Sequence, residues 1–196
     1  IEIGNSVIEA SDHVRNIGAI FDPQLKMNLQ ISLTCKSAWH RLYQIGKIRP
    51  YLSEDQTKTV IHAYVTSKID QNNGLLYGAP DYQIAKIQKV QNASAKLIFK
   101  KKKIDHATPL LRQLHWLPVN RRIDFKILLL TYKALHGLAP SYLTSLLEPY
   151  QPRRDLRSNQ NTRDLTLVIP RTNPKLQTYG DHSFSVAAPR LWNALP

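Results

Sequence analysis

LHWLPVNRRIDFKILLLTYKALHGLAP, residues 114–140, combines a tryptophan and a proline with two adjacent arginines and a nearly continuous apolar run. Apolar side chains on most faces of residues 120–136 are typical of a helix at the centre of a helical bundle. Pro118 suits a first helical turn, and Gly137 suits the position that follows a helix end. The stretch therefore predicts a mainly α-helical protein organised around this helix.

Upstream of this stretch, apolar periodicity and capping residues predict a unit of three helices. Apolar side chains recur at helical spacing over residues 25–48, and a proline follows. Ser53 is a favourable N-cap for a second helix that runs to about residue 69. Asp81 is the expected cap of a third helix, which finishes in the lysines of residues 100–103, where cations match the helix dipole.

The two ends of the chain carry strand signals. Residues 1–8 and VRNIGAIF at 14–21 are rich in β-branched residues interrupted by glycines, which predicts a β-hairpin. Residues 151–164 are polar and rich in arginine, typical of a surface loop. LTLVIP at 165–170 resembles a strand, and we expect Trp192 to pack onto a core. The last segment should therefore hold one or two short strands.

The expected order is a hairpin, a helical bundle, a second helical unit and a short mixed C-terminal segment. The corresponding ranges are 1–24, 25–104, 105–150 and 151–196. The chain begins at Ile1 without a methionine and stops directly after an apolar motif. We expect it to be a piece of a longer protein.

Net charge and cysteine content limit the partners and the compartment. The chain of 196 residues has 27 Lys+Arg against 14 Asp+Glu, a formal charge of +13. Such an excess predicts attraction to polyanions, chiefly nucleic acid. No apolar stretch reaches the roughly 18 residues of a membrane span, so no membrane partner is expected. Cys35 is the only cysteine, which excludes an internal disulfide and favours a reducing, intracellular compartment.

Catalytic and metal-binding motifs are missing from the sequence. It contains no G-x-S-x-G, no phosphate-binding glycine loop, no H-E-x-x-H and no paired cysteines. Cys35 and His40 would give a zinc ion only two ligands. The acidic residues are scattered, which disfavours a two-metal carboxylate site. We therefore expect no catalytic residue and no metal site in these residues.

Basic clusters are the candidate functional feature. A single cluster is more simply explained as solvated surface, but one sign of charge sustained over many segments favours contacts along phosphates. The candidate nucleic-acid-binding residues are Lys36, Arg41, Lys47, Arg49, Lys100, Lys101, Lys102, Lys103, Arg121 and Arg122, with Arg153, Arg154, Arg157 and Arg163 in the late loop. The aromatic residues Trp116, Tyr132, Phe184 and Trp192 lie at core spacing and favour packing over base stacking.

Several strings follow one another in a recognisable order. They are VRNIGAIFD, IGKIRPYLS, SKIDQNNGLLYGAP, IQKVQNASAKLIF, ATPLLRQLHWLPVNRRIDFKILLLTYKALHGLAPSYL and YGDHSFSVAAPRLWNALP. This succession resembles the C-terminal part of reverse transcriptases from non-LTR retrotransposons of the jockey-like or LINE type. It covers nearly the whole chain, and LHWLPV and PRLWNALP are its most specific parts.

The resemblance implies a function. In that family two palm aspartates hold the catalytic Mg²⁺, and their motif would precede Ile1, so the fragment alone is expected to be inactive and to hold no cofactor. VRNIGAIFD resembles the hairpin that supports the primer terminus, which implies a primer-grip role for Asn16, Ile17 and Gly18. The helices resemble the thumb, which contacts the template–primer duplex. The implied partners are RNA and DNA with little sequence preference, in the cytoplasm and nucleus.

A second interpretation stays open beside the resemblance. The chain could be a domesticated or decayed helical fragment that serves as a protein-interaction module. Its basic charge would then be a matter of solubility.

Overall fold

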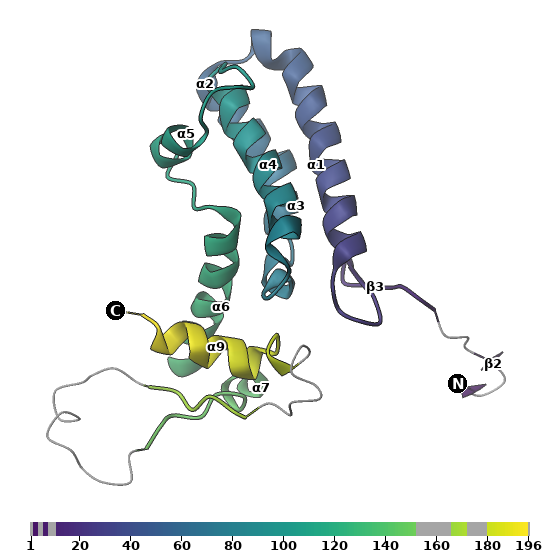
Figure 1. The fold of residues 1–196 in the computed structure, drawn as a ribbon, viewed down its shortest axis with the longest axis vertical. Coiled ribbons are helices and arrows are strands. Elements are labelled where there is room, and N and C mark those ends of the chain that lie inside the picture. The colour runs from purple at the N-terminus through teal and green to yellow at the C-terminus, as the bar shows by residue number, and fades with distance from the viewer. Residues whose placement is uncertain (1, 4–5, 8–10, 152–165, 172–179, 196) are drawn as a thin grey trace, which may run out of the picture. The chain divides into compact units, whose positions relative to one another are not determined.

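The computed structural model describes residues 2–3, 6–7, 11–151, 166–171 and 180–195 (Figure 1). Its fold is mainly helical with an N-terminal antiparallel hairpin, which confirms the expected fold class. The chain divides into two compact units, Ile1–Asn120 and Arg121–Pro196. We describe each unit by itself.

Two short antiparallel hairpins open the first unit. Strand β1 (Glu2–Ile3) pairs with β2 (Ser6–Val7), and β3 (Val14–Asn16) pairs with β4 (Ala19–Phe21). The loop of the second hairpin is Ile17-Gly18, with φ of 46° and 79°. Two consecutive positive φ angles define the type I′ turn that matches strand twist. The predicted hairpin in VRNIGAIF is therefore confirmed.

The second hairpin is anchored to the helices by polar contacts at its turn. The Asn72 side-chain amide donates to the Ile17 carbonyl at 3.1 Å, and the Ile20 N–H donates to Gln30 Oε1 at 3.0 Å. A Cβ added at Gly18 would lie 2.8 Å from Gln71 Nε2. Glycine takes this positive φ without a steric penalty, and a Cβ there would require the end of the flexible Gln71 side chain to move.

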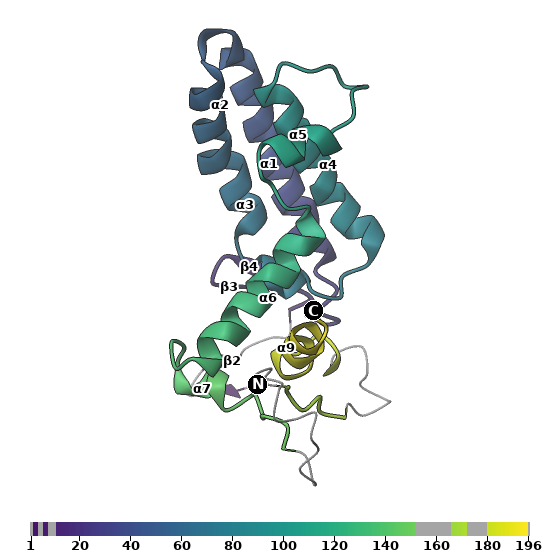
Figure 2. The same cartoon turned by 90° about the vertical axis from the view of Figure 1, so that its left-hand side faces the viewer.

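Three helical segments form the body of the first unit. They are α1 (Asn28–Ile48), a segment composed of α2 (Glu54–Ile61), the π-helical turn η2 (His62–Thr66) and α3 (Ser67–Asp70), and α4 (Asp81–Ile98). The short 3₁₀ turns η1 (Arg49–Tyr51) and η3 (Asn73–Leu76) connect them. Figures 1 and 2 show α1 beside α4 and beside the α2–α3 segment.

The core of this body consists of aliphatic side chains at helical spacing. The buried residues are Ile31, Ala38, Leu42 and Ile45 of α1, Ile61, Val65 and Ile69 of the second segment, and Ile87, Val90, Ala95 and Ile98 of α4. This is the apolar stripe that periodicity predicts for each helix. The three-helix arrangement was therefore predictable from sequence.

The helix starts differ in part from those expected. Ser53 does cap α2, and Gln56 completes a capping box with it. Helix α1 begins at Asn28, because Leu25 and Met27 have positive φ. Asp81 is the first residue of α4 and not its cap, a position that Pro80 occupies.

Two glutamines of α4 hold the backbone of residues 117–119, which connects α5 (Thr108–Gln113) to the next helix. After α5 the Trp116 side chain is buried. The Gln91 amide donates to the Leu117 carbonyl at 2.9 Å, and the Val119 N–H donates to Gln88 Oε1 at 2.8 Å. Val119 begins α6 (Val119–Leu135), so Gln88 satisfies one of the unpaired N–H groups at that helix start.

Helix α6 is only partly buried. Ile123, Ile127 and Ala134 form one buried stripe, whereas Phe125 is 55% and Tyr132 46% exposed. The expectation that this helix is covered on most sides is therefore wrong. The core interpretation of Tyr132 is also wrong, because its ring stacks on His136 at 4.0 Å in an exposed position.

Gly137 ends α6 as predicted. Its φ is +69°, and the Leu138 N–H donates to the Lys133 carbonyl at 2.8 Å. A positive φ at this position with a bond back across the last turn is the Schellman motif.

The second unit joins α6 to a C-terminal helix through a short extended segment. Helices α7 (Ser141–Thr144) and α9 (Phe184–Asn193) belong to it, and Pro149 bridges Leu167 in antiparallel fashion. In the described part of residues 151–196 the extended pairing is this bridge and not a longer strand. Trp192, expected to pack onto a core, is half-buried.

Candidate nucleic-acid interface

One face of α1 carries cations and exposed aromatic rings. Lys36, Tyr43 and Lys47 are separated by seven and four positions, which places them on the same side of a helix. The Lys47 ammonium lies 4.7 Å from the centroid of the Tyr43 ring. Trp39 is 44% and Tyr43 64% exposed. This face therefore offers both positive charge and π surface.

The lysines after α4 lie on a loop with a defined backbone. Lys100 has φ of 51°, its N–H donates to the Leu97 carbonyl at 3.3 Å, and the Lys101 N–H donates to the Lys96 carbonyl at 2.9 Å. These bonds form a Schellman motif in which a lysine takes the left-handed position that glycine usually occupies. The Lys96 ammonium donates to the Lys103 carbonyl at 2.7 Å and holds the loop beside its own helix.

The left-handed lysine leads to a stability prediction. Lys100→Gly should raise the free energy of unfolding by about 0.5–1 kcal/mol, because glycine adopts this conformation without a steric penalty from Cβ. Urea denaturation measures the change. Lys100→Ala is the matched control: it removes the same charge but keeps Cβ, so an equal gain in both variants would attribute the effect to charge.

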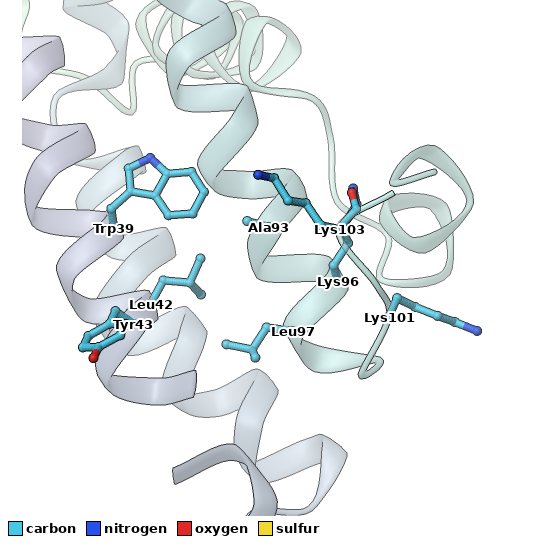
Figure 3. Close-up of a pocket in the computed structure, with 8 residues that line it drawn as sticks. All are labelled: Trp39, Leu42, Tyr43, Ala93, Lys96, Leu97, Lys101 and Lys103. Carbon is cyan, nitrogen blue, oxygen red and sulfur yellow. The ribbon is translucent and has the colours of Figure 1, made fainter. Parts of the chain in front are cut away.

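The α1 face and the α4 loop border one groove, which we call the α1–α4 groove. Its volume is about 400 Å³, and Figure 3 shows the residues that line it: Trp39, Leu42, Tyr43, Ala93, Lys96, Leu97, Lys101 and Lys103. None of these lining residues is acidic. Trp39 and Leu42 of α1 point toward α4, the Tyr43 ring lies at the α1 edge, and Lys101 extends outward at the opposite edge (Figure 3).

Lys36, Lys47 and Lys102 complete the positive charge of this region. Each is exposed, and Lys36 and Lys47 share the α1 face with the groove aromatics. The Lys102 N–H donates to Asp105 Oδ2 at 2.7 Å, so the backbone of the loop is fixed at this point too. Of the sequence-predicted lysines, Lys101 and Lys103 line the groove, and Lys47 lies over the Tyr43 ring that lines its α1 side.

Arg49 has a structural role. The residue is buried, and its guanidinium donates to the carbonyls of Leu97 at 3.0 Å, Ile98 at 2.6 Å and Leu52 at 2.7 Å. Its N–H groups are therefore directed at the last carbonyls of α4 and away from solvent. We remove Arg49 from the set of candidate phosphate ligands.

Arg41, Arg121 and Arg122 are not among the residues that line the groove. Arg41 donates to Gln44 at 3.2 Å, and its guanidinium lies 6.0 Å from the Tyr64 ring centroid. Arg121 is paired with Asp124 at 3.5 Å in an exposed position, and Arg122 is half-buried. An exposed pair of this type contributes a few tenths of a kcal/mol. The late-loop arginines 153, 154, 157 and 163 lie outside the described residues.

The residues predicted to resemble a primer grip lie at the tip of the second hairpin. Asn16 and Gly18 are exposed, and the Ile17 side chain is 87% exposed at a positive φ. A β-branched residue is rare in this conformation. The tip is therefore accessible, and its primer-grip role stays a prediction.

Comparisons with known proteins give no family assignment. No protein-family model, curated protein or solved structure matches this chain.

Trp39, Tyr43 and Lys96 are site residues that sequence reasoning missed. Trp39, Tyr43 and Lys47 recur every four positions, so two rings and a cation on one helix face were visible in the sequence. The pattern alone does not indicate a binding role for the two rings, because large aromatic residues are usually core residues. Lys96 gave no signal of its own, since its neighbour Lys103 is brought to it by the turn of the loop.

Other chemistry has little support among the described residues. No group of three potential metal ligands occurs there, and no helix is long and apolar enough to cross a membrane. Burial raises the pKa of the Cys35 thiol, and the nearby Lys86 ammonium opposes this effect only in part. Cys35 therefore lacks the lowered pKa of a reactive thiolate.

Proposed function

We propose that the chain is the non-catalytic C-terminal part of a retrotransposon reverse transcriptase, which grips template–primer duplex and element RNA through phosphate contacts. The sequence resemblance is the source of the polymerase assignment. The α1–α4 groove is the observation that carries the binding function, because Lys96, Lys101 and Lys103 line it opposite the aromatic rings of α1 and its lining contains no acid. Ammonium groups in such a setting replace the counterions of phosphates.

In this proposal the chain binds nucleic acid, and the rest of the polymerase performs DNA synthesis. The Mg²⁺ ions would belong to palm aspartates outside these residues. The lysines of the groove would contact phosphates, which are the same in every sequence, and are not grouped with side chains that read base edges. Duplex binding should therefore show little sequence preference. An active element would use the protein in the cytoplasm and nucleus.

The salt dependence of duplex binding tests the proposal. Replacing Lys47, Lys101 and Lys103 by glutamine should make the log–log slope shallower by about 0.9 for each phosphate of a B-form duplex that these lysines no longer neutralise. Fluorescence anisotropy of a labelled duplex at several salt concentrations measures this slope. The expected weakening is the same for unrelated duplex sequences.

A matched variant separates local contacts from net charge. Lys68, Lys89 and Lys126 are exposed and do not line the groove. Their triple replacement by glutamine gives the same net charge and should leave most of the slope unchanged. Equal effects of the two triple variants would contradict a phosphate site at the groove and leave general electrostatic attraction.

A protein-interaction module is the second candidate function. Its specific support is the exposure of Phe125 and Tyr132 on α6, since aromatic residues are enriched at protein interfaces. A chain that binds neither duplex nor RNA near physiological salt would favour this alternative.

A further inference from the structure

The α1–α4 groove has a feature that phosphate contacts alone do not require. Its floor is aromatic and aliphatic, with Trp39 and Tyr43 exposed beside Leu42, Ala93 and Leu97. A regular duplex presents phosphates on its outside and keeps the faces of its bases stacked inside. A lysine patch without exposed rings would therefore be sufficient for a duplex.

An unpaired nucleotide matches both parts of the groove. It carries a negative phosphate and a free π face, and proteins that hold single strands combine a positive groove with aromatic stacking surfaces. A volume of about 400 Å³ falls in the range of about 300–1,000 Å³ that is usual for sites of small ligands. We propose that the α1–α4 groove binds an unpaired nucleotide of single-stranded RNA or DNA, with the base stacked on Trp39.

The contacts around the two rings assign different roles to them. The Lys47 ammonium lies over the Tyr43 ring at 4.7 Å, so one face of that ring already has a cation. No such cation contact involves Trp39 among the described residues. Trp39 is therefore the stacking platform, and Lys47, which lies over the Tyr43 ring, is a partner for the phosphate.

The opposite edge of the groove is organised before a ligand arrives. The Lys96 ammonium binds the Lys103 carbonyl at 2.7 Å, and the Schellman motif at Lys100 fixes the direction of the chain after α4. The loop that carries Lys101 and Lys103 therefore needs little ordering on binding, which lowers the entropic cost of association.

This inference rests on the proposed nucleic-acid binding, but it also requires that the affinity for a single strand depends on the Trp39 ring. Trp39→Ala in the full chain should weaken binding to a labelled oligouridylate of about ten nucleotides by roughly 5- to 100-fold, as loss of one stacked base implies. Affinity for a duplex of the same length should change less than about twofold, because its bases are not free to stack. Trp39→Phe should retain most of the affinity for the single strand.

Matched controls exclude a loss of folding. Tyr51 is 87% exposed and does not line the groove, so Tyr51→Ala should leave both affinities unchanged. Quenching of intrinsic fluorescence by the oligonucleotide reports the stack directly, and Trp39→Phe should abolish it, because Trp116 is buried and neither Trp116 nor Trp192 lines the groove. The melting temperature of each variant is measured alongside.

The outcomes distinguish the failure of this inference from the failure of the proposed function. Duplex binding that depends on the lysines, with single-strand binding indifferent to Trp39→Ala, overturns the stacking site and keeps the proposed function. Binding of neither nucleic acid overturns both. Tighter binding of an oligoglutamate peptide than of the oligouridylate, with the same dependence on Trp39, would assign the groove to an acidic protein and overturn the inference.

Discussion

Arg49→Met is expected to lower the free energy of unfolding by about 3 kcal/mol, because it removes three charge-assisted hydrogen bonds of a buried guanidinium and leaves the buried Ile98 carbonyl without this donor. The guanidinium binds the Leu97, Ile98 and Leu52 carbonyls in a residue that is only 7% exposed. Leu97 and Ile98 end α4, where carbonyls have no partner within the helix and where a positive charge is favourable. Methionine preserves much of the side-chain volume but none of these interactions.

Two further arginine variants define the origin of the loss. Arg49→Lys should recover only part of the stability, because an ammonium lacks the planar fork that reaches several carbonyls. Arg41→Met removes an exposed arginine of the same helical segment and should change stability by less than about 0.5 kcal/mol. Urea denaturation measures all three. Unchanged stability with weaker duplex binding in Arg49→Met would restore Arg49 to the phosphate ligands.

Asn193→Ala is expected to destabilise the second unit by about 2 kcal/mol, since two backbone groups of a buried residue lose their partner. The Leu167 N–H donates to Asn193 Oδ1 at 3.0 Å, and the Asn193 side-chain amide donates to the Leu167 carbonyl at 2.8 Å. Leu167 is 2% exposed, so water has little access to the residue that loses these bonds. The Asn193 side chain thus makes the two hydrogen bonds with the Leu167 backbone that a neighbouring strand would make in a sheet.

Hydrogen exchange at the Leu167 amide measures this prediction locally. Asn193→Asp is the informative control, because it preserves an acceptor for the N–H but opposes the Leu167 carbonyl with a carboxylate. Exchange should be fast in the alanine variant and partly protected in the aspartate variant. Equal protection in the wild-type chain and Asn193→Ala would show that the two hydrogen bonds contribute no stability.

The sequence predicted the features that depend on local chemistry. Ser53 as a helix cap and Gly137 at a left-handed position each follow from the preferences of a few adjacent residues. Apolar periodicity then predicted the three-helix body. Such signals depend on side chains that lie close together along the chain.

Features that depend on distant partners were not predictable in this way. Arg49 and the carbonyls of Leu97 and Ile98 are 48 and 49 positions apart, so the arginine looked like any other cation of its segment. The sequence does not show that Trp39 is exposed, because only the packing of α1 on α4 decides which side of each helix faces solvent. The sequence therefore predicted the lysines of the candidate site but not the aromatic residues that line it.

The π-helical turn η2 gives the second helical segment a place at which its length can change by one residue. Ile61, Val65 and Ile69 are buried at intervals of four residues, and in a straight α-helix each interval would rotate the side chain by about 40°. The wider turn, in which the Ser67 N–H reaches the His62 carbonyl, accommodates one residue more than a regular helix would between Ile61 and Ile69. A single-residue deletion within His62–Thr66 would bring Ile61 and Ile69 to a separation of about seven residues, at which a regular α-helix places two side chains only about 20° apart. A chain shortened by one residue here should therefore keep both isoleucines on the core side.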